Sequence, residues 1–153
     1  MQCYLPDVES TMRAGAAVAA GLRAGMIVTL AGELGAGKTT LVRGMLRALG
    51  WTGTVKSPSF ALVEHYQIAS IYFYHFDLYR FNDPTEWDAT GFAEYFRPDA
   101  ICVIEWPERA AGRLLHPDIA ALLAHAPPGR MLALKAHTPA GKTCLAACST
   151  TIR

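Results

Sequence analysis

The sequence predicts an α/β fold of three layers, in which helices cover a mixed central sheet that has an antiparallel C-terminal extension. Two apolar runs, at residues 26–31 and 100–104, are rich in β-branched side chains and are typical of strands covered on both faces. Over residues 38–49 the apolar side chains instead recur at helical spacing, and a glycine follows as a stop signal. The chain has 153 residues, so we expect one domain over its whole length.

Composition argues against several classes of protein. The 14 basic and 13 acidic residues nearly cancel, which leaves no broad electrostatic footprint for nucleic acid. An RNA-related role would therefore work through partners or a local patch. There is no run of eighteen apolar residues and no basic segment ahead of an apolar core, so we expect a soluble, cytoplasmic protein. The four cysteines form no C-x-x-C pair, which suits a reducing compartment.

One stretch between the first strand and its helix has the spacing G-x-x-x-x-G-K-[ST] of the phosphate-binding P-loop. It reads Gly32-Glu33-Leu34-Gly35-Ala36-Gly37-Lys38-Thr39. Its glycines can adopt backbone angles closed to other residues, so successive N–H groups turn inward around a phosphate. Lys38 would reach the outer phosphates, and the Thr39 hydroxyl would ligate magnesium. The strand–loop–helix context therefore predicts a P-loop NTPase-like fold that binds a nucleotide phosphate at a helix start.

The chain ahead of this loop looks helical over residues 7–23, where Asp7 or Ser10 can cap the first turn. Gly25 ends the element before the first strand. Thr11, near the helix start, is either an exposed surface residue or a contact to nucleotide. The physical chemistry of the sequence alone favours the surface.

A polar loop follows the P-loop helix at residues 54–60, because Pro58 rules out a regular helix at Ser57. In P-loop proteins a hydroxyl-bearing loop at this place often senses the terminal phosphate and the metal, and a plain connection is the alternative. Residues 61–66 and 71–76 then read as strands. The aromatic side chains of the second strand favour core packing over base stacking.

Two carboxylates stand where predicted strands end. Asp77 follows residues 71–76, and Glu105 follows residues 100–104 in the form of a Walker B strand. Ligands of open α/β sheets gather beyond the carboxyl ends of the strands, so both side chains are placed for magnesium or for the attacking water. A partly exposed strand-end carboxylate is the alternative for Glu105. His75, two residues before Asp77, should lie on the same side of the strand as Asp77. Core packing, or a hydrogen bond to a neighbouring residue, would explain a histidine at this position equally well.

The remaining elements carry less information. Asp83 and Pro84 predict a capped helix whose aromatic side chains serve packing. Beyond Pro107, three short candidate strands at residues 119–125, 131–136 and 143–148 predict the antiparallel extension of the sheet.

Four separate stretches, taken together, resemble the TsaE family. They are residues 30–40, 55–60, 74–80 and 104–107, which contain the P-loop and the patterns S-P-S-F, H-F-D-L-Y-R and E-W-P in the family's order. Residues 5–15 are also similar to the family's first helix. The resemblance covers roughly residues 5–110, with a looser match through Arg130.

The resemblance implies a bacterial cytoplasmic ATPase that uses ATP and Mg²⁺ and is needed to form threonylcarbamoyladenosine in tRNA. Members of the family act with TsaB and TsaD, and ATP hydrolysis supports the turnover of that complex. They do not themselves transfer the threonylcarbamoyl group. The resemblance thus implies contact with tRNA only through the complex, and no role at a membrane.

The resemblance also implies roles for individual residues. The implied catalytic residues are Lys38, Asp77 and Glu105, and the implied magnesium ligands are Thr39 and Glu105. Ser59 stands where the family commonly has threonine, and it keeps the hydroxyl. The implied nucleotide-binding residues are those of the P-loop, two serines of the polar loop and three outlying side chains: Thr11, Gly32, Glu33, Leu34, Gly35, Ala36, Gly37, Lys38, Thr39, Thr40, Ser57, Ser59, Trp106 and Arg130.

A small-molecule P-loop kinase is the alternative function. It would need an acceptor pocket and usually an arginine-bearing lid, for which Arg109 and Arg113 are the nearby candidates. A GTPase-type module is disfavoured, because the only asparagine, Asn82, precedes Asp83 and cannot form the guanine-reading N-K-x-D signature. The lack of an evident arginine finger predicts slow hydrolysis until a partner completes the site.

Overall fold

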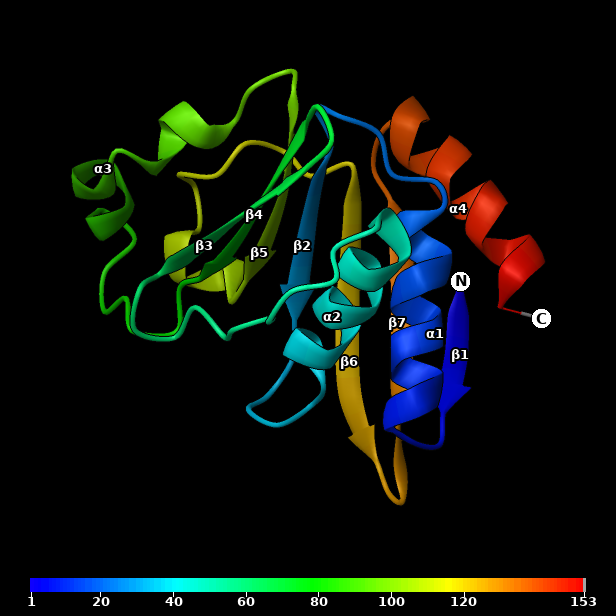
Figure 1. Cartoon of the computed structure of the whole chain (residues 1–153). Helices are drawn as coiled ribbons and strands as arrows, with labels where there is room; N and C mark the ends of the chain where they lie inside the picture. The colour runs from blue at the N-terminus through cyan, green and yellow to red at the C-terminus, as the bar shows by residue number, and fades with distance from the viewer. Residues whose placement is uncertain (153) are drawn as a thin grey trace.

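The computed structural model describes residues 1–152, which form a single sheet of seven strands (Figure 1). The spatial order is β1-β7-β6-β2-β5-β4-β3. The central strands β6, β2, β5 and β4 are parallel, whereas β1, β7 and β3 pair antiparallel with their neighbours. The strand bounds are β1 Gln2–Leu5, β2 Ile27–Ala31, β3 Val63–Ile68, β4 Ile71–Asp77, β5 Ala100–Glu105, β6 Ile119–Ala126 and β7 Gly129–Ala136.

Two hydrophobic clusters, one on each face of the sheet, give the molecule its three layers. The larger cluster packs α1 (Val8–Ala19), α2 (Lys38–Leu49) and α4 (Pro139–Thr151) on the sheet. The smaller cluster lies under α3 (Glu86–Thr90) and the 3-10 helices Phe92–Tyr95 and Pro107–Ala110. Alternate residues of β5 enter alternate clusters, as the two-residue period of a strand requires. The predicted three-layer α/β fold with a mixed sheet is thereby confirmed. No helix within residues 1–152 is long and apolar enough to cross a bilayer.

The elements around the P-loop form as their sequences predict. Helix α2 spans Lys38–Leu49, and Gly50 ends it in the left-handed conformation. Helix α1 begins at an Asp7 cap, where the Ser10 N–H donates to the Asp7 carboxylate at 2.7 Å. It ends at Ala19, before residue 23. Strand β3 starts later than predicted, because Leu62 has a positive φ of 68° that an extended strand cannot contain.

The C-terminal region differs from the prediction in two ways. Residues 143–148 lie in helix α4, so their assignment to a strand was wrong. Thr138 caps this helix by accepting the Gly141 N–H at 3.0 Å, and Cys144 packs with its thiol 3.4 Å from the Val18 carbonyl oxygen. Strand β6 runs parallel to β2, so the antiparallel pairing begins only at β7, and it continues into β1, which the sequence pattern did not reveal.

Helices α1 and α2 approach closely because each presents a glycine to the other. A Cβ on Gly15 would lie within 3.0 Å of the Leu41 carbonyl oxygen, and one on Gly44 within 3.0 Å of the Met12 carbonyl oxygen. Both obstacles are backbone atoms, which cannot rotate away as a side chain does. The contact fixes the position of α2, whose first turn carries Lys38 and Thr39.

We predict that Gly44→Ala destabilises the protein by about 2 kcal/mol, because overpacking forces the two helices apart. Helix propensity alone predicts the opposite effect, because replacing glycine by alanine at an unobstructed helix position raises the free energy of unfolding by about 1 kcal/mol. Chemical denaturation of the wild type and the variant measures the difference. An unchanged or increased free energy of unfolding would contradict the close packing of α1 on α2.

Candidate functional site

The P-loop occupies the connection between β2 and α2, and its glycines adopt backbone conformations that other residues avoid. The φ angles of Gly32, Gly35 and Gly37 are 144°, 76° and 105°. At Gly37 a side chain would also collide with the Arg130 guanidinium, which comes from β7 and lies against the loop. The hairpin of β6 and β7 touches the loop a second time, where the His125 ring lies 3.2 Å from the Leu34 carbonyl oxygen.

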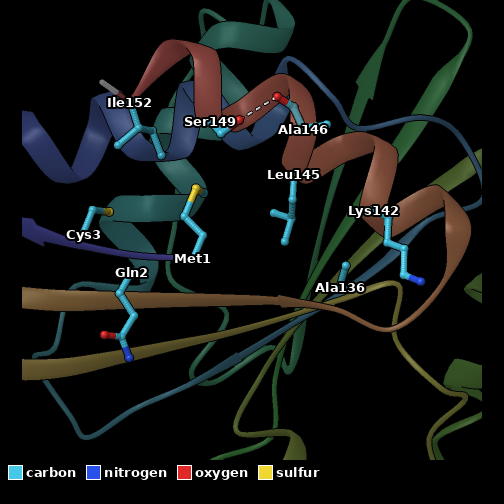
Figure 2. A pocket seen from close by; sticks show the side chains of 9 residues that line it. All are labelled: Met1, Gln2, Cys3, Ala136, Lys142, Leu145, Ala146, Ser149 and Ile152. Carbon is cyan, nitrogen blue, oxygen red and sulfur yellow. Dashed lines mark hydrogen bonds between the residues drawn. The ribbon is translucent and has the colours of Figure 1, made fainter.

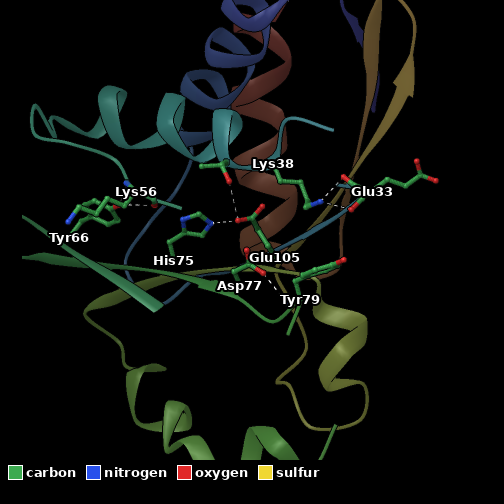
Figure 3. A network of polar contacts seen from close by, with 10 residues as sticks. Glu33, Lys38, Lys56, Tyr66, His75, Asp77, Tyr79 and Glu105 are labelled. Carbon is green, nitrogen blue, oxygen red and sulfur yellow. Dashed lines mark hydrogen bonds and ion pairs between the residues drawn. The ribbon is translucent and has the colours of Figure 1, made fainter. Parts of the chain in front are cut away.

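Lys38 is folded back onto the loop that precedes it. Its ammonium donates to the carbonyl oxygens of Gly32 and Glu33, the latter at 2.9 Å (Figure 3). The same Nζ lies 4.4 Å from the centre of the Trp106 ring. Burial lowers the pKa of Lys38 from its usual value, and the carboxylates of Glu105 and Asp77 oppose that shift. The site therefore holds a cation among carbonyl oxygens, where an anionic ligand can replace them.

The two predicted carboxylates meet at one edge of the sheet. Asp77 and Glu105 end the parallel neighbours β4 and β5 and are partners in their register. Both are buried, with 7% and 3% of their surface exposed. The pKa of Asp77 is raised above its usual value, mainly by burial and also by the charge of Glu105. The Tyr79 N–H, which donates to the Asp77 carboxylate at 2.9 Å, partly opposes this shift. The alternative of a partly exposed carboxylate at Glu105 is thus wrong.

Glu105 is held by His75 of β4 (Figure 3) and by Thr39, which lies in the first turn of α2. The His75 Nε2 is 2.7 Å from the Glu105 Oε2, and the Thr39 hydroxyl donates to the same oxygen over 3.5 Å. His75 is completely buried. In the sequence, the signal for this contact is the spacing of two residues between His75 and Asp77, which places both on one side of the strand.

These groups line a pocket of about 140 Å³ at the start of α2. Four separate segments contribute to it, and Tyr79 is the one member that the sequence analysis did not single out. The lining residues are Leu34, Gly35, Lys38, Thr39, Ser57, Ser59, Asp77, Tyr79, Glu105 and Trp106. Trp106 is held in the left-handed conformation, with a φ of 58°, and its ring lies 4.9 Å from that of Tyr79.

The other predicted residues do not line this pocket. Gly32 and Glu33 contribute the carbonyl oxygens that bind Lys38. Ala36 is buried, and Thr40 lies in the first turn of α2. Thr11 lies on α1 and is fully buried, so the surface interpretation was wrong. Its hydroxyl donates to the Asp7 carbonyl oxygen at 2.9 Å, which ties it to the capped first turn.

The oxygen atoms at this site suit magnesium. A threonine hydroxyl and two carboxylates are hard ligands, which Mg²⁺ prefers. Within residues 1–152 no group of three or more His, Cys, Asp or Glu side chains can hold a metal ion. Mg²⁺ commonly takes one or two carboxylates and completes its coordination with water and substrate phosphates. The donors therefore fit a metal that binds together with a nucleotide rather than a closed metal site.

A larger hollow, of about 680 Å³, lies between α4 and the β1 edge of the sheet (Figure 2). Its lining is mostly apolar, and among residues 1–152 Lys142 is the only charged side chain that lines it. The Ser149 hydroxyl is already bonded to the Ala146 carbonyl oxygen at 2.9 Å. The described residues that line it include no cluster of ionisable side chains like that at the P-loop, so the smaller pocket is the better candidate for chemistry.

The chain is similar to known proteins over most of its length. The family model "Threonylcarbamoyl adenosine biosynthesis protein TsaE" matches residues 5–124. The tRNA threonylcarbamoyladenosine biosynthesis protein TsaE of Haemophilus influenzae is 44% identical over 151 residues, which is 95% of this chain and 96% of that protein. TsaE of Synechocystis is 40% identical over 119 residues, or 71% of each chain.

A solved structure is similar over nearly the whole fold. The crystal structure of Bacillus subtilis YdiB superposes with a TM-score of 0.84 and 25% sequence identity, covering 98% of this chain and 94% of that one. The family model spans most of the chain, and the Haemophilus influenzae relative spans nearly all of it. This chain therefore belongs to the TsaE family of threonylcarbamoyl adenosine biosynthesis proteins.

Proposed function

We propose that this protein is a Mg²⁺-dependent ATPase that supports the formation of threonylcarbamoyladenosine in tRNA. The observation that carries the proposal is the pocket at the start of α2. There Lys38 and Thr39 of the P-loop helix meet Asp77 and Glu105 of two neighbouring strand ends. Membership of the TsaE family supports the tRNA-modifying role, and with it a cytoplasmic location.

The P-loop would bind the phosphates of ATP. The first N–H groups of an α-helix have no partner within the helix, and the helix dipole favours an anion at the N-terminus of α2. Lys38 would exchange the carbonyl oxygens of Gly32 and Glu33 for phosphate oxygens, and in doing so release Trp106. Its buried cation then lies next to the charge that develops during transfer of the terminal phosphoryl group, where a low dielectric strengthens its effect.

The two carboxylates would divide the remaining work. The Glu105 carboxylate is fixed by His75, and it also accepts a hydrogen bond from the Thr39 hydroxyl. We therefore assign the Thr39 hydroxyl and the Glu105 carboxylate as the ligands of Mg²⁺. When bound, the metal neutralises negative charge on the phosphates. Asp77 accepts one N–H on Oδ1, and within residues 1–152 no donor meets its second oxygen. We assign Asp77 to the attacking water, which a carboxylate orients by accepting its hydrogen bond.

Slow hydrolysis by the protein alone follows from the positions of its arginines. Within the part of the chain that is described, no arginine lines the pocket. Arg80 lies 4.1 Å from the centre of the Phe60 ring, and the Arg109 guanidinium donates to the Phe81 carbonyl oxygen at 3.1 Å. A partner would therefore complete the stabilisation of charge. We propose TsaB and TsaD as those partners, with tRNA engaged through their complex and the threonylcarbamoyl transfer carried out by them.

A small-molecule kinase has less support. Its lid would require Arg109 or Arg113, but Arg113 is paired with Asp88 at 3.0 Å and Arg109 is bound as above. Phosphate transferred to a metabolite rather than to water would favour the kinase.

Replacing Lys38 tests the phosphate cradle. Lys38→Ala should abolish ATP hydrolysis with and without TsaB and TsaD, and should fail to support tRNA modification, because the cradle loses its cation. The control Lys142→Ala removes a lysine from the α4 hollow and should match the wild type in both assays. Wild-type levels of tRNA modification by Lys38→Ala would sink the proposal.

Replacing Asp77 separates binding from chemistry. Asp77→Asn should bind Mg²⁺–ATP with an affinity close to that of the wild type, because Asp77 is assigned neither to the phosphates nor to the metal. Its hydrolysis rate should fall by about 100-fold or more, as expected for the loss of a catalytic carboxylate. Titration calorimetry and phosphate release measure the two effects. An equal loss of affinity and rate would instead place Asp77 in the binding of ATP.

A further inference from the structure

His75 is a buried polar side chain that contacts Glu105, one of the residues that line the pocket. It lies on β4, two residues before Asp77, and its imidazole reaches across to β5 to meet the Glu105 carboxylate (Figure 3). The ring is fully buried, and its Nδ1 has no hydrogen-bond partner in the described residues.

We infer that His75 is a positioning residue, which fixes the Glu105 carboxylate so that it meets the magnesium ion of the nucleotide complex. The inference rests on the proposed function, since it gives Glu105 a metal to bind. It adds a residue that touches neither nucleotide nor metal and acts through Glu105 alone.

The hydrogen-bond geometry determines which nitrogen of His75 donates to Glu105. A carboxylate oxygen only accepts, so the Nε2 at 2.7 Å must carry the hydrogen. A second hydrogen on Nδ1 would be buried without an acceptor among residues 1–152. The structure thus fits the tautomer with its hydrogen on Nε2, which donates to Glu105.

This bond restrains the carboxylate. Oε2 of Glu105 is engaged by His75 and, more weakly, by Thr39, whereas no donor within residues 1–152 meets Oε1. Rotation of the carboxylate would break the short bond to His75 inside the core, where a lost hydrogen bond is costly. Oε1 is therefore the oxygen left for a metal or its water.

Core packing alone does not account for an imidazole at this position. An apolar ring would fill the same space without burying the unpaired Nδ1, which costs free energy wherever it is not solvated. Phe73, two residues earlier on the same side of β4, is such a ring in the same layer. The bond to Glu105 is what distinguishes position 75 from position 73.

A pair of amide substitutions tests the inference. The amide nitrogen of His75→Gln occupies the place of Nε2 and can donate to Glu105, whereas that of His75→Asn occupies the place of Nδ1 and cannot. Calorimetric titration of ATP in EDTA and at graded Mg²⁺ concentrations separates nucleotide affinity from metal affinity. His75→Asn should need about 10-fold more Mg²⁺, the usual cost of losing the partner of a metal ligand, while its affinity in EDTA stays unchanged.

His75→Gln should recover most of the Mg²⁺ affinity. In a Glu105→Ala background His75→Asn should have no further effect on it, because no carboxylate remains to be positioned. The control His65→Phe alters a ring that packs on Tyr74 and Tyr95, in a different cluster, and should leave both affinities unchanged.

Equal Mg²⁺ affinities for the two amide variants, or losses in EDTA as large as those in Mg²⁺, would overturn the inference and leave the proposed function standing. Binding of ATP by the wild type that does not respond to Mg²⁺ would overturn the proposed function, and the inference with it.

Discussion

The parallel pairing of β2, β5 and β4 is the constraint on which the rest of the structure depends. It aligns Leu30, Glu105 and Asp77 in one row across the sheet, immediately before the P-loop begins. A slip of one residue in either pairing would turn the carboxylates to the opposite face, away from α2. The two core clusters prevent such a slip, because each strand must place alternate side chains in different clusters.

The same constraint explains why the site is both buried and polar. Lys38, His75, Asp77 and Glu105 are all nearly inaccessible to solvent, and each has a hydrogen bond to another group of the site or its loop. Since the helices are positioned by the contacts of Gly15 and Gly44, the first turn of α2 is fixed relative to the strand ends. A rigid, preformed arrangement of donors costs little reorganisation when charge develops, which is how such sites contribute to catalysis.

What the sequence predicts well is local, and what it misses depends on packing. The strand, loop and helix around residues 26–49 follow from periodicity and glycine placement, and the structure reproduces them. Helix α4 was not predicted, because its sequence of small apolar and polar side chains has no clear helical periodicity of hydrophobic residues. The burial of Thr11 depends on how α1 docks, and the bond between His75 and Glu105 joins residues 30 positions apart through strand register. Neither is encoded in any short stretch of the chain.

We propose that α2, β4 and β5 together form one site for a nucleotide and its magnesium ion. A crystal structure of the protein with Mg²⁺ and a non-hydrolysable ATP analogue tests it most directly. We predict phosphates in the loop at residues 32–39, with the Lys38 ammonium moved from its carbonyl partners to the phosphate oxygens. We also predict the metal at about 2.1 Å from the Thr39 hydroxyl and bound by Glu105, directly or through one water. A nucleotide bound elsewhere, or a metal bound away from both residues, would contradict this proposal.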